Sequence, residues 1–240
     1  LYSSAASDVY KRQVDSSPLS DTPRPGNAKF KKLTPVDPNS TNPYQLTEAD
    51  RTVIGNTTPK FSGGFGLNAT YKGFDMSMFF NFMYDFDVLN ANKIMLTTWA
   101  DNKENNFLMD IASDKRWRNF DDMGNEIRYS PEVLAEFNKN ATMWNPTSIG
   151  RPICMSYAVE DGSFLRLNSA TLGYTLPSVW TKKVGLSKVR FYVSGNNLFT
   201  LAGYSGYDPE VNIATGLTPN IDYNRYPRSR TYTFGAQLTF

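Results

Sequence analysis

The chain has 240 residues, enough for one large or two ordinary domains, and a formal net charge of +2. Its Lys and Arg residues are scattered rather than clustered, which argues against a nucleic-acid-binding protein. The absence of histidine excludes Ser-His-Asp catalysis, Cys-His catalysis and His-ligated metals, and the single cysteine, Cys154, excludes an internal disulfide and a Cys-based zinc site. Aromatic residues make up 14% of the chain although the mean hydropathy is −0.46, which suits strands that are apolar only at alternate positions.

Residues 1–13 do not read as the start of a natural protein, because they have no initiator Met and neither the basic nor the apolar region of a signal peptide. They resemble a spurious peptide translated from adapter or vector DNA. We therefore expect an artefactual segment at 1–13, a linker or incomplete loop at 14–27, and one structured segment at 28–240. The natural protein is expected to begin upstream.

A short strand is predicted at 28–33, followed by a turn-rich loop at 34–60. Glu48 and Asp50 in this loop are potential calcium ligands, but their spacing does not match an EF-hand. A solvated loop is the favoured interpretation.

The clearest hairpin is predicted from two alternating segments, 61–71 and 74–86, joined by a tight turn at Lys72 and Gly73. Each arm has 11 to 13 residues, whereas a typical globular strand has about 5 to 6. About 9 to 11 tilted residues cross a bilayer. The apolar runs are too short for a transmembrane helix, so the hairpin predicts membrane-spanning strands.

Residues 87–162 break the alternation and predict a long loop with a short helix at 131–138. Trp99, Trp117 and Trp144 lie in this loop, where they either stack on sugar rings or hold the loop together; the second role is favoured. Asp121 and Glu160 are candidate glycosidase carboxylates, but solvated loop charge explains them more simply.

Alternation returns at 163–176 and 188–200, which flank a short helical connection at 177–186. A second long loop at 201–228 leads to a terminal strand at 230–240 that ends on Phe240 without a polar tail. This strand alone fits either a barrel or a soluble sandwich. If the C-terminus is periplasmic, however, every long loop (34–60, 87–162 and 201–228) lies outside and every short turn lies inside, which favours a barrel.

Five motifs resemble, in the same order, the SusC/RagA family of TonB-dependent outer-membrane transporters of Bacteroidota. They lie at 163–167, 171–177, 189–200 and 206–210 and at the terminal Phe240, and 50–56 is similar to the family's preceding segment. The resemblance implies an all-β fold, with about six antiparallel strands from the C-terminal part of a plugged barrel of about 22 strands. An Asp- and Gly-rich run common in the family is replaced here by residues 37–42, which further weakens a calcium role.

The resemblance also implies function: import of an oligosaccharide or peptide at the outer membrane, coupled to the TonB complex, with a SusD-like surface lipoprotein as partner. It implies no enzymatic activity and no cofactor. Candidate contacts to ligand or partner are Tyr204, Tyr207, Asp208 and Glu210, although Asp208 and Pro209 also favour a turn. Phe240 is the expected barrel-assembly signal. The alternative is a soluble secreted all-β carbohydrate-binding module that uses Trp99, Trp117 and Trp144.

Overall fold

The computed structural model describes residues 25–28, 30–35, 39, 48–98, 106–111, 115–148, 154–210 and 220–240. The chain divides into two compact units. One comprises residues 1–55 and 89–159, and the other comprises 56–88 and 160–240. The second unit contains the long strands and the candidate site.

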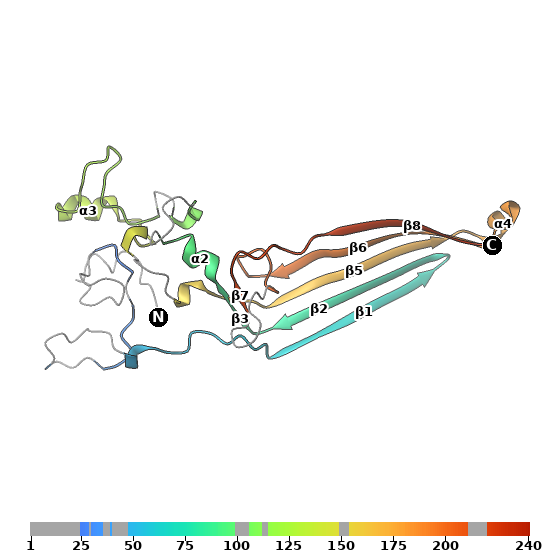
Figure 1. The fold of residues 1–240 in the computed structure, drawn as a ribbon, viewed down its shortest axis with the longest axis horizontal. Coiled ribbons are helices and arrows are strands. Elements are labelled where there is room, and N and C mark those ends of the chain that lie inside the picture. Colours follow the sequence, from blue (N-terminus) through green and yellow to red (C-terminus); the bar gives the residue numbers. More distant parts are fainter. Residues whose placement is uncertain are drawn as a thin grey trace. The chain divides into compact units, whose positions relative to one another are not determined.

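Five long strands form an antiparallel sheet in the order β1-β2-β5-β6-β8 (Figure 1). They are β1 (Phe61–Tyr71), β2 (Phe74–Tyr84), β5 (Phe164–Thr175), β6 (Lys188–Ala202) and β8 (Thr231–Thr239). The predicted hairpin and the three later strands are therefore confirmed to within two residues at each end. The sequence suggested about six strands, and five are found in this sheet.

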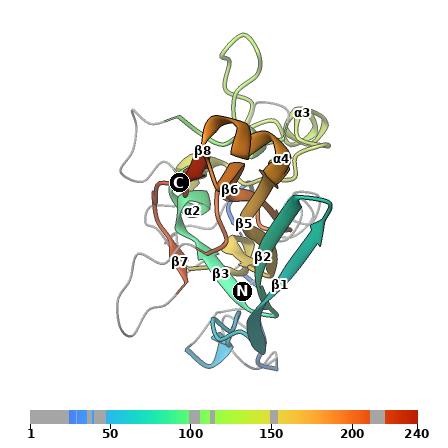
Figure 2. The same cartoon turned by 90° about the vertical axis from the view of Figure 1, so that its right-hand side faces the viewer.

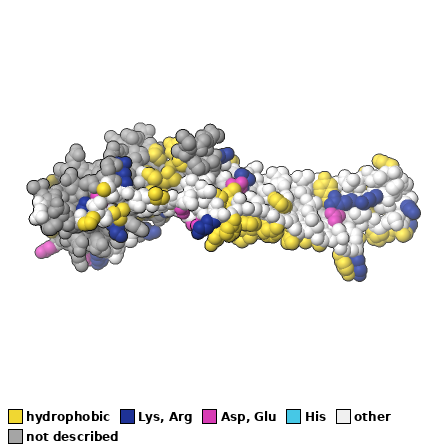
Figure 3. Space-filling model, turned by 90° about the horizontal axis from the view of Figure 1, so that it is seen from below, with side chains coloured by type: hydrophobic (Ala, Val, Ile, Leu, Met, Phe, Trp, Pro, Cys, Tyr) yellow, Lys and Arg dark blue, Asp and Glu magenta, His cyan; other side chains and the backbone are white. Residues whose placement is uncertain are grey.

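The strand register collects the alternating apolar residues onto one face of the sheet. One rung runs from Leu67 through Met78 to Ala170, and the next runs from Ala69 through Met76 and Leu172. The same face continues across β6 and β8, where Val193 is paired with Phe234. Hydrophobic side chains accordingly line one side of the long-stranded sheet in Figure 3. The face has no covering layer within the described part of this unit, and many of its large apolar side chains are exposed.

An extra residue in β5 interrupts the register. Phe79 pairs with Ser169 and Phe80 pairs with Leu167, so Asn168 bulges out of the ladder. A one-residue insertion exchanges the two faces of a strand. The odd-numbered Leu165 and Leu167 therefore share the apolar face with the even-numbered Ala170 and Leu172. This bulge explains why the first half of the segment looks mixed in sequence.

Short connections join the strands at one end of the sheet. Lys72 and Gly73 both have positive φ, 46° and 91°, which is the conformation of a two-residue type I′ hairpin turn. Between β5 and β6 the chain makes a helical turn, α4 (Ser178–Thr181) and η5 (Lys182–Val184), which ends at Gly185 with φ 74°. This is the predicted short connection, and its last residue is the left-handed glycine expected of a helix end.

A second, three-stranded sheet has the order β4-β3-β7. Its strands are β3 (Asp87–Asn90), β4 (Val159–Asp161) and β7 (Ile221–Asp222). Phe86 was expected to extend the alternation of β2, but β2 ends at Tyr84. Phe86 instead packs with Val88, Phe164 and Tyr204 in a buried cluster, as an edge-to-face partner of Phe164. The view in Figure 2 looks along the long strands β1, β2, β5, β6 and β8.

The first unit is built from short helices around two apolar clusters. Its helices are η1 (Glu48–Asp50), α2 (Ala91–Met95), η2 (Met109–Ile111), α3 (Pro131–Phe137), η3 (Pro146–Ser148) and η4 (Ser156–Ala158). The α3 helix confirms the one predicted in the long loop, and Pro131 occupies its first turn, where no backbone donor is lost. No helix in the described ranges is both long and apolar enough to cross a membrane.

The strand predicted at 28–33 is wrong: the described residues of this segment have no ladder partner. Ala28 and Phe30 are buried in a cluster with Ile111, Met143 and Trp144. The alternate apolar residues Ala28 and Phe30 thus pack into a side-chain cluster, and a two-residue repeat in sequence does not by itself establish a strand.

Candidate functional site

A group of buried charges lies where the long loop after β6 meets the sheet. The Arg166 side chain, on β5, is 1% exposed and forms an ion pair with Asp208, whose side chain is 7% exposed. A second carboxylate, Glu210, lies 3.4 Å from Nη1 of Arg166 and 3.1 Å from Nη2 of Arg228. Arg166 and Asp208 thus form a buried, paired charge couple, the condition under which buried charges are tolerated. Glu210 is partly exposed, and it links this pair to Arg228, whose side chain is 49% exposed.

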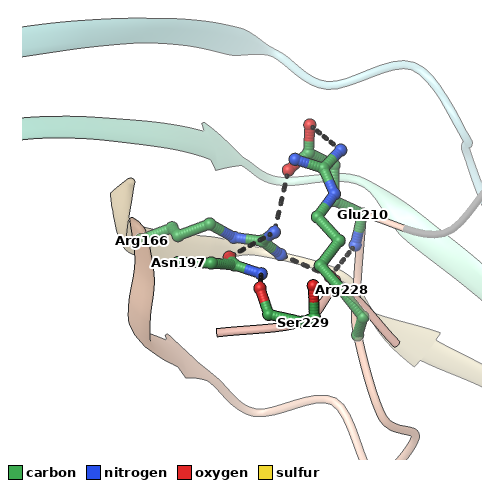
Figure 4. A network of polar contacts seen from close by, with 6 residues as sticks. Arg166, Asn197, Glu210, Arg228 and Ser229 are labelled. Carbon is green, nitrogen blue, oxygen red and sulfur yellow. Dashed lines mark hydrogen bonds and ion pairs between the residues drawn. The ribbon is translucent and has the colours of Figure 1, made fainter. Parts of the chain in front are cut away.

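Backbone geometry brings this group together (Figure 4). Asn197 has a positive φ of 59°, and it lies where β6 has one residue more than β5. Its side-chain oxygen accepts from Nη1 of Arg166 at 3.3 Å, and its Nδ2 donates to the carbonyl of Ser229 at 3.2 Å. The network therefore ties β5 and β6 to both the start and the end of the loop at 203–230.

Two further contacts anchor the beginning of this loop. The Tyr204 hydroxyl donates to Oδ2 of Asp222 at 2.7 Å, and the Glu160 carboxylate accepts from both the amide and the hydroxyl of Ser205. Burial, reinforced by Asp222, raises the pKa of Tyr204 above its ordinary value. The ring of Tyr204 is held in place and is not presented to solvent.

Among the four loop candidates, the structure separates one exposed residue from three buried or partly buried ones. Tyr207 is 84% exposed, whereas Asp208 and Tyr204 are buried and Glu210 is occupied by two arginines. Asp208 also accepts the backbone amide of Glu210 at 2.9 Å, which is the turn-forming contact that its sequence context predicts. The arrangement makes Asp208 and Glu210 loop anchors and leaves Tyr207 as the accessible side chain.

The tryptophan candidates do not form an exposed platform. Trp117 is 2% exposed and packs with Ile127, Leu134 and Ala141, while Trp144 is buried against Tyr157. Nε1 of Trp144 donates to the carbonyl of Thr97. Stacking on a sugar requires an open ring face, so these two rings act within the loop. Trp99 lies outside the described residues.

Asp50, Asp121 and Glu160, three of the carboxylates considered for metal binding or catalysis, have structural contacts; the side chain of Glu48 lies outside the described part of the chain. Asp50 accepts from the amides of Leu33 and Thr34, and Asp121 accepts from those of Met123 and Asn125. The hydrogen-bond donors to Asp121, of which the Asn125 side chain has the largest effect, lower the pKa of Asp121. Among the described residues, no three His, Cys, Asp or Glu side chains cluster as a metal site would require.

Sequence reasoning missed Arg166. Arg166 is an even number of residues from Ala170 and Leu172, so an uninterrupted strand would place all three on the apolar face. The bulge at Asn168 turns it to the polar face, opposite Asn81 and Thr200. One signal for this was available in the sequence. An arginine at a lipid-facing strand position costs so much free energy that its presence there indicates a break in register.

The sheet has one continuous apolar face, an opposite polar face, short turns at one end and long loops at the other. These features define the chain as part of the wall of a transmembrane antiparallel β-barrel. It is 34% identical over 202 residues to TonB-dependent receptor P3 of Formosa agariphila, a match that covers 82% of this chain and 18% of the relative. It is 38% identical over 88 residues to TonB-dependent receptor SusC of Bacteroides thetaiotaomicron, covering 35% of this chain and 8% of SusC.

Solved structures show the same fold. The RagAB peptide importer in its closed-closed state superposes with a TM-score of 0.64 over 90% of this chain and 21% of that chain, at 24% identity. No family model matches. The chain belongs to the SusC/RagA family of TonB-dependent receptors, which are outer-membrane β-barrel proteins, and it spans about a fifth of the length of its relatives.

Proposed function

We propose that residues 28–240 form part of the barrel of an outer-membrane transporter that imports a nutrient, an oligosaccharide or a peptide, in a TonB-dependent manner. A SusD-like surface lipoprotein is the proposed partner. The relatives are named as receptors, and this supports transport rather than enzymatic catalysis. The candidate ligand or partner contact is Tyr207, whose exposed ring is held on a loop that the Arg166 network anchors.

One observation carries the proposal: the register places apolar residues of all five strands on a single uncovered face. Phe234 on this face is 81% exposed. In water such a face opposes folding, since each large apolar side chain that stays exposed lacks the stabilisation of about 1.5–3 kcal/mol that its burial would give. In a bilayer the same face is buried by hydrocarbon.

The test uses a chimeric receptor in which residues 56–240 replace the matched segment of receptor P3. Phe234→Arg puts a charge on the apolar face, and Thr233→Arg puts the same charge on the polar face one residue away. We expect Phe234→Arg to abolish heat-modifiable, membrane-inserted receptor, whereas Thr233→Arg leaves most of it. Equal yields for the two variants would refute a lipid-facing role for this face.

The transport step is tested separately in the same chimera. Tyr207→Ala is expected to reduce uptake of the receptor's nutrient or co-purification of its lipoprotein while leaving the amount of inserted receptor unchanged. Unchanged uptake and unchanged co-purification would remove Tyr207 from the proposed site.

A further inference from the structure

The two ends of the long-stranded sheet differ in charge. Among the described residues at the short-turn end, the only Asp or Glu side chain is Asp75, which forms an ion pair with Arg190. All other Asp and Glu residues of this unit lie near the long-loop end. Lysines dominate the short-turn end, at Lys72 in the hairpin turn and at Lys182 and Lys183 in η5. None of these three has an ion-pair partner among the described carboxylates, and all three are exposed.

Large apolar side chains are exposed beside these lysines. Val179, Trp180 and Val184 of the α4–η5 turn are each at least 60% exposed, and Trp180 is two residues from Lys182. In the hairpin turn, Nζ of Lys72 lies 5.2 Å from the ring centroid of Tyr71, which is itself 70% exposed. Basic and hydrophobic side chains lie together at the right-hand end of Figure 3.

This surface continues the apolar face of the sheet. Phe74 and Tyr174, the last paired rung before the turns, have ring centroids 4.5 Å apart and belong to that face. Where hydrocarbon ends, Trp and Tyr rings occupy the headgroup region and lysine stems extend their ammonium groups toward water. Exposed lysines without carboxylate partners are complementary to anionic headgroups, and each attracts them appreciably. Short turns of such barrels face the periplasm, where the leaflet is phospholipid.

We propose that the short-turn end, centred on Trp180, Lys182 and Lys183, is a binding surface for anionic phospholipid headgroups of the periplasmic leaflet. Trp180 enters the interface and the two lysines hold anionic headgroups around it. The inference rests on the proposed barrel function, because it requires the apolar face to be in the bilayer.

The test uses the chimeric receptor in vesicles that contain equal mole fractions of phosphatidylcholine and phosphatidylglycerol, with one or the other brominated as a fluorescence quencher. Trp180 emission is isolated by subtracting the Trp180→Phe variant. We expect brominated phosphatidylglycerol to quench Trp180 more strongly than brominated phosphatidylcholine. The local preference should fall about five-fold for each lysine removed in Lys182→Gln and Lys183→Gln. The control variant Arg225→Gln with Arg230→Gln removes two cations at the long-loop end, and it should leave the preference for phosphatidylglycerol unchanged.

A separate reporter distinguishes failure of this inference from failure of the proposed function. Phe234→Trp, in the Trp180→Phe background, places an indole on the apolar face. Suppose that lipid quenches the reporter at position 234. If the two lipids then quench Trp180 equally, or if neither lipid quenches Trp180, the headgroup site is refuted and the proposed barrel stands. If neither lipid quenches the reporter at position 234, the sheet does not face lipid, and both the inference and the proposed function fail.

Discussion

Breaking the buried ion pair of Arg166 should release the loop at 203–230. Arg166→Gln leaves the carboxylates of Asp208 and Glu210 with one fewer cation in a site where the Arg166 side chain is 1% exposed and that of Asp208 is 7% exposed. Removing one partner of such a pair costs about 3–5 kcal/mol, because the remaining charge stays desolvated. Arg228 still neutralises Glu210, so we expect the lower part of this range.

The matched control is Lys60→Gln. Lys60 also pairs with a carboxylate, Asp85, at the same end of the sheet, but the two side chains are 69% and 45% exposed. Solvent screens such a pair, and removing it should have little effect on loop opening.

Chymotrypsin cleavage of the chimeric receptor in detergent measures the difference, because neither variant changes the tyrosines of the loop. When opening is fast, cleavage follows the open population. Tyr204 is the informative cleavage site, because it is buried and bonded to Asp222 until the loop opens. A loss of about 3 kcal/mol raises the cleavage rate at Tyr204 by more than about a hundredfold. Similar cleavage of the two variants would refute the view that the Arg166 network anchors the loop.

Three further outcomes are expected. Gly173→Val should disrupt the polar face, since a Cβ at this position would lie 2.6 Å from Oδ1 of Asp75, which is bonded to Arg190. The measurement is the amount of membrane-inserted receptor, which should fall. Gly124→Val is the control for the added side chain, because no atom lies within 4 Å of a Cβ at that position, although its φ of 86° adds some strain. Tyr204 has a raised folded pKa, so the loop should lose stability as pH rises above about 10, and Tyr204→Phe should remove this dependence in the same protease assay. Trp117→Ala should cost about 3–5 kcal/mol of local stability, which increased amide exchange around α3 would show and unchanged exchange would contradict.

Strands and short turns were predictable from sequence because both follow local rules. The hairpin needs only alternation and a turn whose two residues accept positive φ, and Lys72 and Gly73 meet this condition. The helical connection at 177–186 was equally readable from its Pro start and Gly stop. Apolar alternation predicted the apolar face in every long strand except the first half of β5, where the bulge at Asn168 changes the phase. Register then joined the strands into one surface.

The site was less predictable because its contacts join residues far apart in sequence. Arg166 meets Asp208 across 42 positions, and no local pattern marks that distance. Tyr204 and Asp208 were recognised as candidates, but alternation cannot tell an exposed loop residue from an anchoring one. The prediction at 28–33 failed for the converse reason, since its two-residue repeat is local but the contacts of Ala28 and Phe30 are with apolar side chains far along the chain, such as Ile111 and Met155.

The bulge at Asn168 sets the phase of β5. A strand has only two phases, and deletion of this one residue would switch every position that precedes it. Arg166 would then face hydrocarbon, while Leu165 and Leu167 would turn toward the polar side. Residue 168 therefore acts as a spacer, whose presence matters more than its side chain. Position 168 should accept many substitutions and no deletion, so insertion-deletion scanning would identify it where alanine scanning would not.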